Sequence, residues 1–353
     1  IYKSSLAYEK TRVELRLGVR VETIDRGAKM LLIKGSAPLR YDKLVIATGG
    51  HARELAVPGA GLRNVFYLRT IADVEALRPL IAAPQRLAIV GGGYIGLEAA
   101  AVAVKRKLAV TVLEGAPRVL ARVAAPDLSQ FYERIHRDAG VDIRTGVTVS
   151  GFTAGDEEGN VGGVVCAGGQ SLAADIVLIG IGLVPNIELA EQAGLAVDDG
   201  IVVDAESRTS DPNIYAIGDC AMHAHHGFLQ RKIRLESVPN AIEQARAAAA
   251  SIMGLPIPAA AAPWFWSDQY DLKLQMAGVS DGYEELAIRG SMEASSFIAF
   301  YLKEGRVIGA DSVNRLGEFM AAKRIVGERM EIAAARLADE SAPLKSLLRS
   351  AAA

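Results

Sequence analysis

Cysteine is scarce in this sequence of 353 residues, which contains only Cys166 and Cys220. The two lie far apart and form no Cys-x-x-Cys pair, so we expect neither a disulfide framework nor a cysteine-rich zinc site. Such sparing use of thiols is typical of a protein from a reducing compartment. A cytoplasmic location is therefore the expectation.

An excess of charge of either sign is also missing, because the formal net charge at pH 7 is −2. Without a basic excess we expect no nucleic-acid partner. Long apolar runs are missing too, since a stretch such as residues 245–252 is short and rich in alanine, and we expect no contact with a membrane. The length exceeds that of one ordinary core and indicates two or three domains.

Strands and helices alternate along most of the chain, which predicts an α/β fold with parallel sheets and right-handed crossovers. We expect two interleaved dinucleotide-binding domains followed by a C-terminal α+β domain. One dinucleotide-binding domain would take residues 1–82 and 195–260, the other residues 83–194, and the C-terminal domain residues 261–353.

Local patterns add finer expectations. Alternating apolar residues predict strands over 12–16 and 19–24, whereas residues 221–230 read as a polar loop and residues beyond 326 as a loose tail. The loop contains His223, His225 and His226. Because no acid or cysteine lies near them, a solvated loop is favoured over a metal site, which stays the alternative.

The strongest single feature is Gly91-x-Gly93-x-x-Gly96, which follows an apolar strand at 87–90 and opens a helix. The first glycine permits the tight turn, the second lets the backbone approach a pyrophosphate, and the third lets the helix pack on the strand. Glu114 ends the next strand, where it would accept hydrogen bonds from ribose hydroxyls and repel a 2′-phosphate. The complete unit argues for NAD binding over a mere packing turn.

Two further motifs each end an apolar strand, the position where open α/β sheets bind ligands. They are Ala47-Thr48-Gly49 and Gly218-Asp219. An aspartate there can accept a hydrogen bond from a polyol hydroxyl, such as those of the ribityl chain of FAD. Alone, each motif is equally compatible with an ordinary turn. Together, on either side of the NAD unit, they indicate a second nucleotide-binding domain.

A helix is predicted from Asn240 to Met253, and Ser237-Val238-Pro239 leads into it. Glu243 lies three residues beyond Asn240, which predicts a capping box. The positive end of this helix could also face the pyrimidine edge of a flavin and stabilise its reduced anion. A plain capped helix is the equally weighted alternative.

These motifs together resemble the bacterial FAD-dependent NADH:ferredoxin reductases that serve oxygenase systems. The resemblance runs from about Val13 to the C-terminus and implies hydride transfer from NADH to FAD, then delivery of single electrons to a two-iron ferredoxin. It rests on Gly91-Gly-Gly-Tyr-Ile-Gly-Leu-Glu98, Ala47-Thr-Gly-Gly50, Ile217-Gly-Asp-Cys220, Glu236-Ser-Val-Pro-Asn-Ala241 and Pro263-Trp-Phe-Trp-Ser-Asp-Gln269.

The resemblance implies a role for individual residues at the flavin. Val21 would touch the adenine of FAD through its backbone, Asp219 would hold the ribityl chain, and Val238 would face the pyrimidine edge. An ordinary strand valine is the alternative for Val21. The other residues expected to bind FAD are Ala47, Thr48, Gly49, Arg69 and Ser237.

At the nicotinamide side, the resemblance implies that Glu98 lies near the carboxamide and that Arg122 joins Glu114 at the adenosine. Trp266 would lie beside the isoalloxazine, on the side where electrons leave. Glu98 and Trp266 are therefore the expected catalytic residues, although Trp266 could instead be ordinary core packing. Ile95 and Gly182 would complete the NAD site.

The sequence departs from the family pattern at its beginning. Family members start with another strand, glycine turn and helix that bind the FAD pyrophosphate, followed by a Pro-Pro-Leu-Ser-Lys segment. Ile1 stands where a methionine would begin a chain and matches the middle of the FAD domain. We therefore expect a chain that lacks this unit and holds FAD poorly.

Other classes of protein stay open. A flavin disulfide reductase or NADH peroxidase would need a reactive cysteine, but Cys220 directly follows Asp219 and is expected to pack. A non-catalytic, redox-sensing flavoprotein related to apoptosis-inducing factor would turn over slowly with a ferredoxin. A fragment that binds NAD alone would carry no flavin. The sequence names neither the ferredoxin nor the terminal oxygenase.

Overall fold

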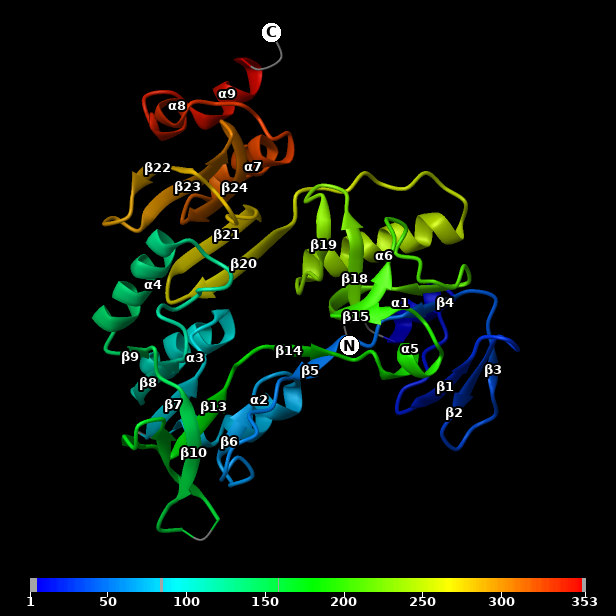
Figure 1. Ribbon diagram of the computed structural model, residues 1–353, viewed down its shortest axis with the longest axis horizontal. Coiled ribbons are helices and arrows are strands. Elements are labelled where there is room, and N and C mark those ends of the chain that lie inside the picture. Colours follow the sequence, from blue (N-terminus) through cyan, green and yellow to red (C-terminus); the bar gives the residue numbers. More distant parts are fainter. Residues whose placement is uncertain (1–4, 83–84, 158, 351–353) are drawn as a thin grey trace.

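A parallel sheet forms the unit built from the middle of the sequence, here called the central unit, in the computed structural model, which describes residues 5–82, 85–157 and 159–350 (Figure 1, lower left). Its strand order is β6-β13-β7-β8-β9, and every neighbouring pair is parallel. The strands are β6 (Val65–Tyr67), β7 (Arg86–Val90), β8 (Ala109–Glu114), β9 (Asp142–Thr145) and β13 (Ile176–Ile179). β13 and most of β7 are buried, as expected for strands covered on both faces.

Helices and a small sheet complete this central unit. The connections contain α2 (Ile71–Leu77), η1 (Leu80–Ala82), α3 (Tyr94–Lys105) and α4 (Pro126–Asp138). An antiparallel sheet of β10 (Val149–Ala154), β11 (Val161–Cys166) and β12 (Ser171–Ala173) precedes β13. This arrangement confirms the predicted α/β unit with parallel strands.

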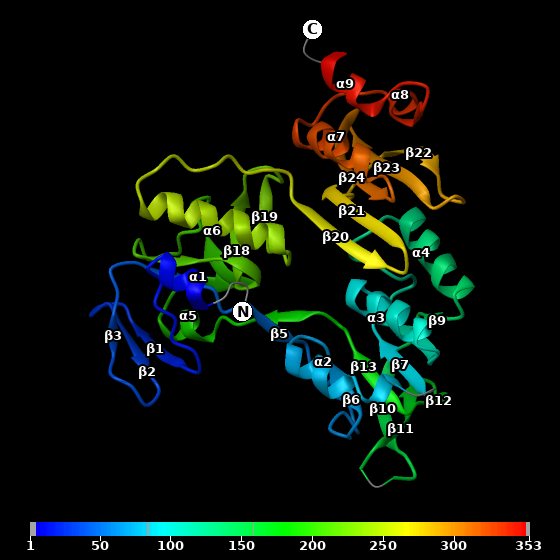
Figure 2. The ribbon, with the colours of Figure 1, turned by 180° about the vertical axis from the view of Figure 1, so that it is seen from behind.

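A second unit is built from two parts of the chain that lie far apart in sequence (Figures 1 and 2). The first part contains α1 (Ser5–Lys10), β1 (Val21–Asp25), β2 (Met30–Ile33), β3 (Leu39–Arg40) and β4 (Leu44–Ile46). The second contains α5 (Glu188–Gln192), β15 (Val197–Asp198), β16 (Gly200–Val203), β17 (Ile214–Ala216), η2 (Gly218–Cys220), β18 (Ala221–His226), β19 (Arg231–Ile233) and α6 (Val238–Ile252).

The two parts share one core, in which Ile24 and Ile46 pack with Ile201 and Ile214. β4 also pairs in parallel with β17. The chain leaves this unit through β5 (Gly50–Ala52) and returns through β14 (Leu183–Pro185), and these two strands pair antiparallel. The predicted interleaving of two nucleotide-binding units is therefore confirmed.

The C-terminal unit is an antiparallel sheet with three helices. The sheet order is β20-β21-β24-β23-β22. Its strands are β20 (Trp264–Gln269), β21 (Leu272–Gly278), β22 (Glu285–Ser291), β23 (Ser296–Lys303) and β24 (Arg306–Val313), and its helices are α7 (Leu316–Gly327), α8 (Ala334–Ala338) and α9 (Leu344–Ser350). This is the predicted α+β fold.

Strand β23 of the C-terminal sheet is buried on both faces. Alternate residues of a strand point to opposite faces, and β23 places Phe297, Ala299 and Tyr301 in a core shared with the central unit. Its intervening residues, Ile298, Phe300 and Leu302, pack instead in a core shared with α7.

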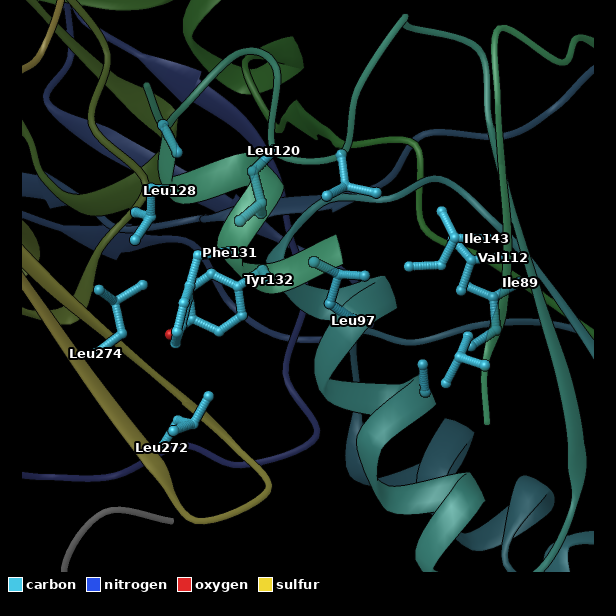
Figure 3. Packing of buried hydrophobic residues seen from close by; sticks show 14 of the residues in the cluster. Ile89, Leu97, Val112, Leu120, Leu128, Phe131, Tyr132, Ile143, Leu272 and Leu274 are labelled. Atoms are coloured by element: carbon cyan, nitrogen blue, oxygen red, sulfur yellow. The ribbon is translucent and has the colours of Figure 1, made fainter. Parts of the chain in front are cut away.

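Helix α4 fills the space between the two sheets. Figure 3 shows Phe131 and Tyr132 of α4 between Leu272 and Leu274 of β21 on one side and Leu97 of α3 on the other. The ring of Phe131 lies 5.1 Å from that of Phe297 at an interplanar angle of 76°, an edge-to-face contact. The C-terminal unit is therefore packed firmly on the central unit.

Three local expectations were wrong. Residues 12–16 form no strand, and no strand of the described chain pairs with them. The predicted polar loop, residues 221–230, contains β18, because main-chain pairing of β18 with β16 outweighs the polar character of its histidines. The predicted loose tail contains α8 and α9, and buried leucines anchor it: Leu337, Leu344 and Leu347.

None of the helices that the structure describes combines the length and the apolar character that a membrane crossing requires.

Candidate active site

The glycine turn between β7 and α3 has the geometry of a nucleotide-binding loop. Gly91 has φ +109°, and a Cβ on it would lie 2.4 Å from the carbonyl oxygen of Gly180. A Cβ on Gly96 would lie 2.1 Å from the carbonyl oxygen of Gly91. These two glycines are therefore needed for close packing of the turn, strand and helix.

Gly93 is different, because a Cβ on it would meet no heavy atom of the described residues within 4 Å. Gly93 is the N-cap of α3, and no side chain caps the helix there. The first N–H groups of α3 therefore receive no side-chain cap from Gly93 and lie at the positive end of the helix dipole, which fits the pyrophosphate of a dinucleotide. Ile95, in the same first turn, is exposed.

Glu114 ends β8 and faces this turn. Its carboxylate accepts hydrogen bonds from the N–H of Gly92 at 2.6 Å and from the N–H of Ala116 at 2.7 Å. Each oxygen keeps a second lone pair, so binding of ribose hydroxyls by Glu114 stays a prediction. Arg122 and Gly182 are close together, with the Arg122 guanidinium 3.7 Å from the position of a Cβ on Gly182.

A groove of about 990 Å³ in the second unit brings several predicted FAD residues together. Val21, Ala47 and Thr48 all line it. Thr48 donates its hydroxyl to the carbonyl oxygen of Asn186 at 2.7 Å, which ties the end of β4 to the chain returning from the central unit. Their contacts with FAD stay predictions.

Arg69 and Asp219 meet beside this groove, where their side chains form an ion pair at 3.0 Å. Arg69 also donates to the carbonyl oxygen of Gly50 at 3.0 Å. Gly49 has φ +63°, and a Cβ on it would lie 3.3 Å from the Arg69 guanidinium. The structure therefore gathers these predicted flavin residues at the ends of β4 and β17.

The start of α6 differs from the predicted capping box. Ser237 is the N-cap, because its hydroxyl oxygen accepts the N–H of Asn240 at 3.2 Å. Asn240 lies inside the first turn and donates to the carbonyl oxygen of Leu235. Pro239 lacks an N–H and is tolerated in this first turn, so the helix begins earlier than expected.

Helix α6 is joined to the turn that carries Asp219. The side-chain oxygen of Gln244 accepts the N–H of Gly218 at 2.7 Å, in a buried contact. The exposed Val238 therefore stands at the positive end of a helix fixed next to Asp219. This placement is compatible with the expected position of Val238 at the flavin.

Glu98 of α3 contacts strand β20 of the C-terminal unit. Its carboxylate oxygen Oε1 accepts a hydrogen bond from the hydroxyl of Ser267, at 2.6 Å from Oγ. Burial raises the pKa of Glu98, and the hydrogen bond from Ser267 acts in the opposite direction. Glu98 is thus a partly buried carboxylate at the junction of two units, a setting in which functional carboxylates are common.

Trp266 precedes Ser267 and points to the opposite face of β20. Its side chain is 41% exposed, so the alternative of ordinary core packing is wrong. Its ring lies 5.6 Å from that of Trp264, and the ammonium group of Lys323 lies 4.5 Å from the centre of the Trp264 ring. An aromatic surface patch of Trp264 and Trp266 therefore lies on the face of β20 opposite the face that contacts Glu98.

The two cysteines are both free and buried, and Cys220 has no exposed surface. The expected packing role of Cys220 is confirmed. The histidines lie on strand β18 and not in a loop, with His226 buried and His225 exposed. Burial, followed by the charges of His223 and His225, lowers the pKa of His226 to about 4. Within the described ranges, no three His, Cys, Asp or Glu side chains are grouped to hold a metal ion.

Sequence reasoning missed the polar partners of Glu98, namely Ser267, Gln269 and, on α4, His136. His136 lies far from the others in sequence and carries no local signal. Ser267 and Gln269 could have been found, because two polar residues at alternate positions of an aromatic strand indicate a polar inward face.

A glycine turn closed by a carboxylate, a second nucleotide-binding unit and a carboxylate held between domains define a nucleotide-dependent oxidoreductase. The family model described as "Pyridine nucleotide-disulphide oxidoreductase" matches residues 4–245, and one described as "Reductase C-terminal" matches residues 264–348. The chain belongs to the pyridine nucleotide-disulphide oxidoreductase family. It is an oxidoreductase that uses FAD and a pyridine nucleotide.

Similar proteins agree with this family over almost the whole chain. Putidaredoxin reductase from Pseudomonas putida is 47% identical, over 98% of this chain and 82% of its own length. The ferredoxin reductase subunit of 5,5'-dehydrodivanillate O-demethylase from a Sphingobium species is 43% identical, over 95% of this chain and 81% of its own length.

Solved structures give the same result. The covalent complex of putidaredoxin reductase with putidaredoxin contains a chain that is 46% identical and superposes with a TM-score of 0.95, over 99% of this chain and 85% of that one. A ferredoxin reductase from Rhodopseudomonas palustris is 39% identical, with a TM-score of 0.94, over 98% of this chain and 85% of that one.

Proposed function

We propose that this chain passes a hydride from NADH to FAD and then single electrons to a two-iron ferredoxin of an oxygenase system, in the cytoplasm. The observation that carries the proposal is the two-sided strand β20. Ser267 reaches inward to Glu98, and the neighbouring Trp266 is exposed on the outer face. One strand therefore connects the nicotinamide side of the site with a surface from which electrons can leave.

The proposed division of labour follows the four segments 1–82, 83–194, 195–260 and 261–353. The first and third would hold FAD, the second would hold NADH, and the last would present the docking surface. Bound FAD supplies the redox chemistry, since a flavin accepts a hydride and gives up electrons one at a time. The chain itself binds and orients the two cofactors.

In the NADH site, the first turn of α3 would hold the pyrophosphate next to Gly93, and Glu114 with Arg122 would hold the adenosine. A free basic side chain after β8 would be able to bind the 2′-phosphate of NADPH. The first basic residue after this strand is Arg118. Its guanidinium donates to Ser129 at 2.5 Å and to the carbonyl oxygens of Ala121 and Ala124. It is therefore engaged elsewhere, while the negative Glu114 repels a 2′-phosphate.

In the FAD site, Asp219 would bind the ribityl chain and exchange its partner Arg69 for a hydroxyl. The positive end of α6 at Ser237 and Val238 would face the pyrimidine edge of the flavin and stabilise negative charge there. Thr48 and Gly49 would bring backbone close to the cofactor. These roles are supported by the shared position of the residues at the ends of β4, β17 and η2.

The proposed docking surface for ferredoxin consists of Trp266, Arg246 of α6 and Lys323 of α7. Arg246 is exposed and carries the available positive charge. Lys323 is half-buried over the Trp264 ring, and burial lowers its pKa while Glu243 opposes the shift. We therefore expect Arg246 to steer the acidic partner and Lys323 to fix the aromatic patch. Redox encounters of this kind are small, transient and sensitive to salt.

NADH-dependent, ferredoxin-linked reduction of cytochrome c tests this function. At low ionic strength, Arg246→Glu should slow the ferredoxin-dependent rate about tenfold or more, since it reverses a charge at the encounter surface. The matched control is Arg40→Glu, which reverses an exposed arginine on β3. Reduction of ferricyanide should be unchanged in both variants.

Added salt should narrow the difference between the wild type and Arg246→Glu. A wild-type rate that stays flat from low to high ionic strength would argue against a charged docking face. Reduction of ferricyanide by NADH without any ferredoxin-linked activity would refute the ferredoxin assignment itself.

A further inference from the structure

A chain of four hydrogen bonds runs from the surface to Glu98. The hydroxyl of Tyr270 lies 2.9 Å from Nδ1 of His136, and Nε2 of His136 lies 2.9 Å from Oε1 of Gln269. Nε2 of Gln269 lies 3.1 Å from the hydroxyl oxygen of Ser267, which lies 2.6 Å from Oε1 of Glu98. The chain joins α3 and α4 of the central unit to β20 of the C-terminal unit.

The donors of this chain all point toward Glu98. Gln269 donates to Ser267 through its amide nitrogen, so its carbonyl oxygen faces His136 and must accept a hydrogen bond from the Nε2–H group. The proton of the neutral imidazole is then on Nε2, and Nδ1 accepts from the Tyr270 hydroxyl. Burial lowers the pKa of His136 and so favours the neutral ring, while the hydrogen bond with Gln269 acts in the opposite direction.

The inner members of the chain are closed off from solvent. His136 and Gln269 have no exposed surface, and Ser267 is 1% exposed. A proton wire is ruled out, because the amide of Gln269 cannot pass a proton onward without changing to a high-energy tautomer. The chain can therefore act only by orienting its members and by polarising each successive donor.

We propose that Ser267, Gln269 and His136 are positioning residues that fix Oε1 of Glu98, so that Oε2 is presented to the carboxamide of the nicotinamide. This inference rests on the proposed role of Glu98 at NADH. In this arrangement the C-terminal unit contributes to NADH binding without touching the coenzyme. It also explains why a polar inward face is kept on β20, next to the apolar core around α4.

The charges around Glu98 make this support necessary. The charge of Asp268 on β20 acts on Glu98, and Glu98 and Asp311 of β24 both act on Tyr94 of α3 and Tyr132 of α4. Asp268 is exposed and forms an ion pair with Lys273 at 2.7 Å, so that base is engaged with Asp268. Burial and the charge of Asp268 raise the pKa of Glu98, while the Ser267 hydroxyl and the backbone N–H of Asp268 lower it.

Ser267→Ala removes the last donor of the hydrogen-bond chain and also the acceptor of the Gln269 amide nitrogen. NAD⁺ binding to the full chain is measured by isothermal titration calorimetry between about pH 5 and pH 9. We expect Ser267→Ala to weaken binding roughly three- to tenfold at neutral pH, since it removes one charge-assisted hydrogen bond. We also expect its pH profile to move upward, because Glu98 would take up a proton at a higher pH.

A matched control is Ser312→Ala on β24. Ser312 is equally buried in the same sheet, and its hydroxyl has no hydrogen-bond partner among the described residues. It should leave both the affinity and the pH profile of NAD⁺ binding unchanged. Ser267→Thr should restore them, because threonine keeps the hydroxyl donor. Thermal unfolding checks that all three variants fold.

Steady-state kinetics of the flavin-loaded enzyme adds a second readout. Ser267→Ala should raise the KM for NADH more than it lowers kcat, because the hydrogen-bond chain acts by positioning Glu98. Glu98→Gln separates the two levels of the inference. If Glu98→Gln binds NAD⁺ as the wild type does, the proposed role of Glu98 fails. If it weakens binding but Ser267→Ala behaves like Ser312→Ala, the positioning role alone is overturned.

Discussion

Two single substitutions, Gly93→Ala and Gly96→Ala, should distinguish the glycine needed for nucleotide binding from the glycine needed for folding. Gly93 has φ −80° and ψ −176°, a conformation open to alanine, and its Cβ would point into free space. The expected cost is small, because replacing glycine by alanine at an N-cap removes no side-chain hydrogen bond and costs about 1 kcal/mol or less. A unit of this size should then melt within about 2–4 °C of the wild type.

Gly96→Ala should do the reverse. Its Cβ would lie 2.1 Å from the carbonyl oxygen of Gly91 and 3.3 Å from Cγ2 of Ile89, so α3 must move outward by about 1 Å to reach normal contact. Overpacking of this kind costs about 1–3 kcal/mol. The better helix propensity of alanine returns only about 1 kcal/mol. The melting temperature should fall by several degrees.

The assay pairs NAD⁺ calorimetry with thermal unfolding. We expect Gly93→Ala to lose about tenfold or more in NAD⁺ affinity, equivalent to about 1.4 kcal/mol, because its methyl group fills the space that phosphate oxygens need. Its melting temperature should stay close to that of the wild type. Undiminished affinity in Gly93→Ala would refute the placement of the pyrophosphate at this turn, whatever happens to Gly96→Ala.

Three further variants test other parts of the structure. Glu114→Gln removes the charge that repels a 2′-phosphate, so the ratio of kcat/KM for NADH over NADPH should fall about tenfold, and an unchanged ratio would contradict this role. Cys220→Ser should keep ferredoxin-linked activity and lose only stability, since Cys220 is buried; lost activity in a folded, flavin-bound variant would revive a thiol mechanism. Burial raises the pKa of Asp311 from 3.8 to about 7, so the folded state keeps a proton that the unfolded state releases. Between these values the free energy of unfolding should fall by about 1.4 kcal/mol per pH unit as pH rises, and Asp311→Asn should flatten this slope in denaturant titrations.

The sequence was a good guide wherever a local pattern carries its own physical reason. The strand predicted at 87–90 agrees with β7, Arg86–Val90, to within one residue, because an apolar run is bounded there by a glycine turn. The glycine turn was identified because its spacing is set by steric needs that the structure shows at Gly91 and Gly96. These features depend on a few neighbouring residues and little else.

Features that depend on distant partners could not be predicted in the same way. β18 was taken for a loop because its histidines are polar, and only its pairing with β16 makes it a strand. The reverse error occurred at residues 12–16, where an apolar alternation has no strand beside it in the described chain. The N-cap of α6 was misplaced because both Ser237 and Asn240 suit the position, and the fold chooses Ser237.

The candidate site shows the same division. The resemblance led to Glu98 and Trp266. The structure adds that the two lie on opposite sides of strand β20, because Ser267 of that strand contacts Glu98 while Trp266 is exposed on the other face. His136 could not have been found from the sequence, because its partner Gln269 lies on a different domain. Such contacts arise only when the C-terminal sheet is placed on α4.

The burial of strand β23 on both faces limits how the domains of such enzymes can be exchanged. Exchanging C-terminal domains between reductases is an obvious route to a new electron acceptor. The host is the reductase that receives the domain, and the donor is the reductase that supplies it. One face of β23 must then fit the central unit of the host, through Phe297, Ala299 and Tyr301. The other face packs with the helices that come from the donor, through Ile298, Phe300 and Leu302. A graft should therefore take the residues of the helix-facing side from the donor and keep those of the other side from the host, in alternation along each strand.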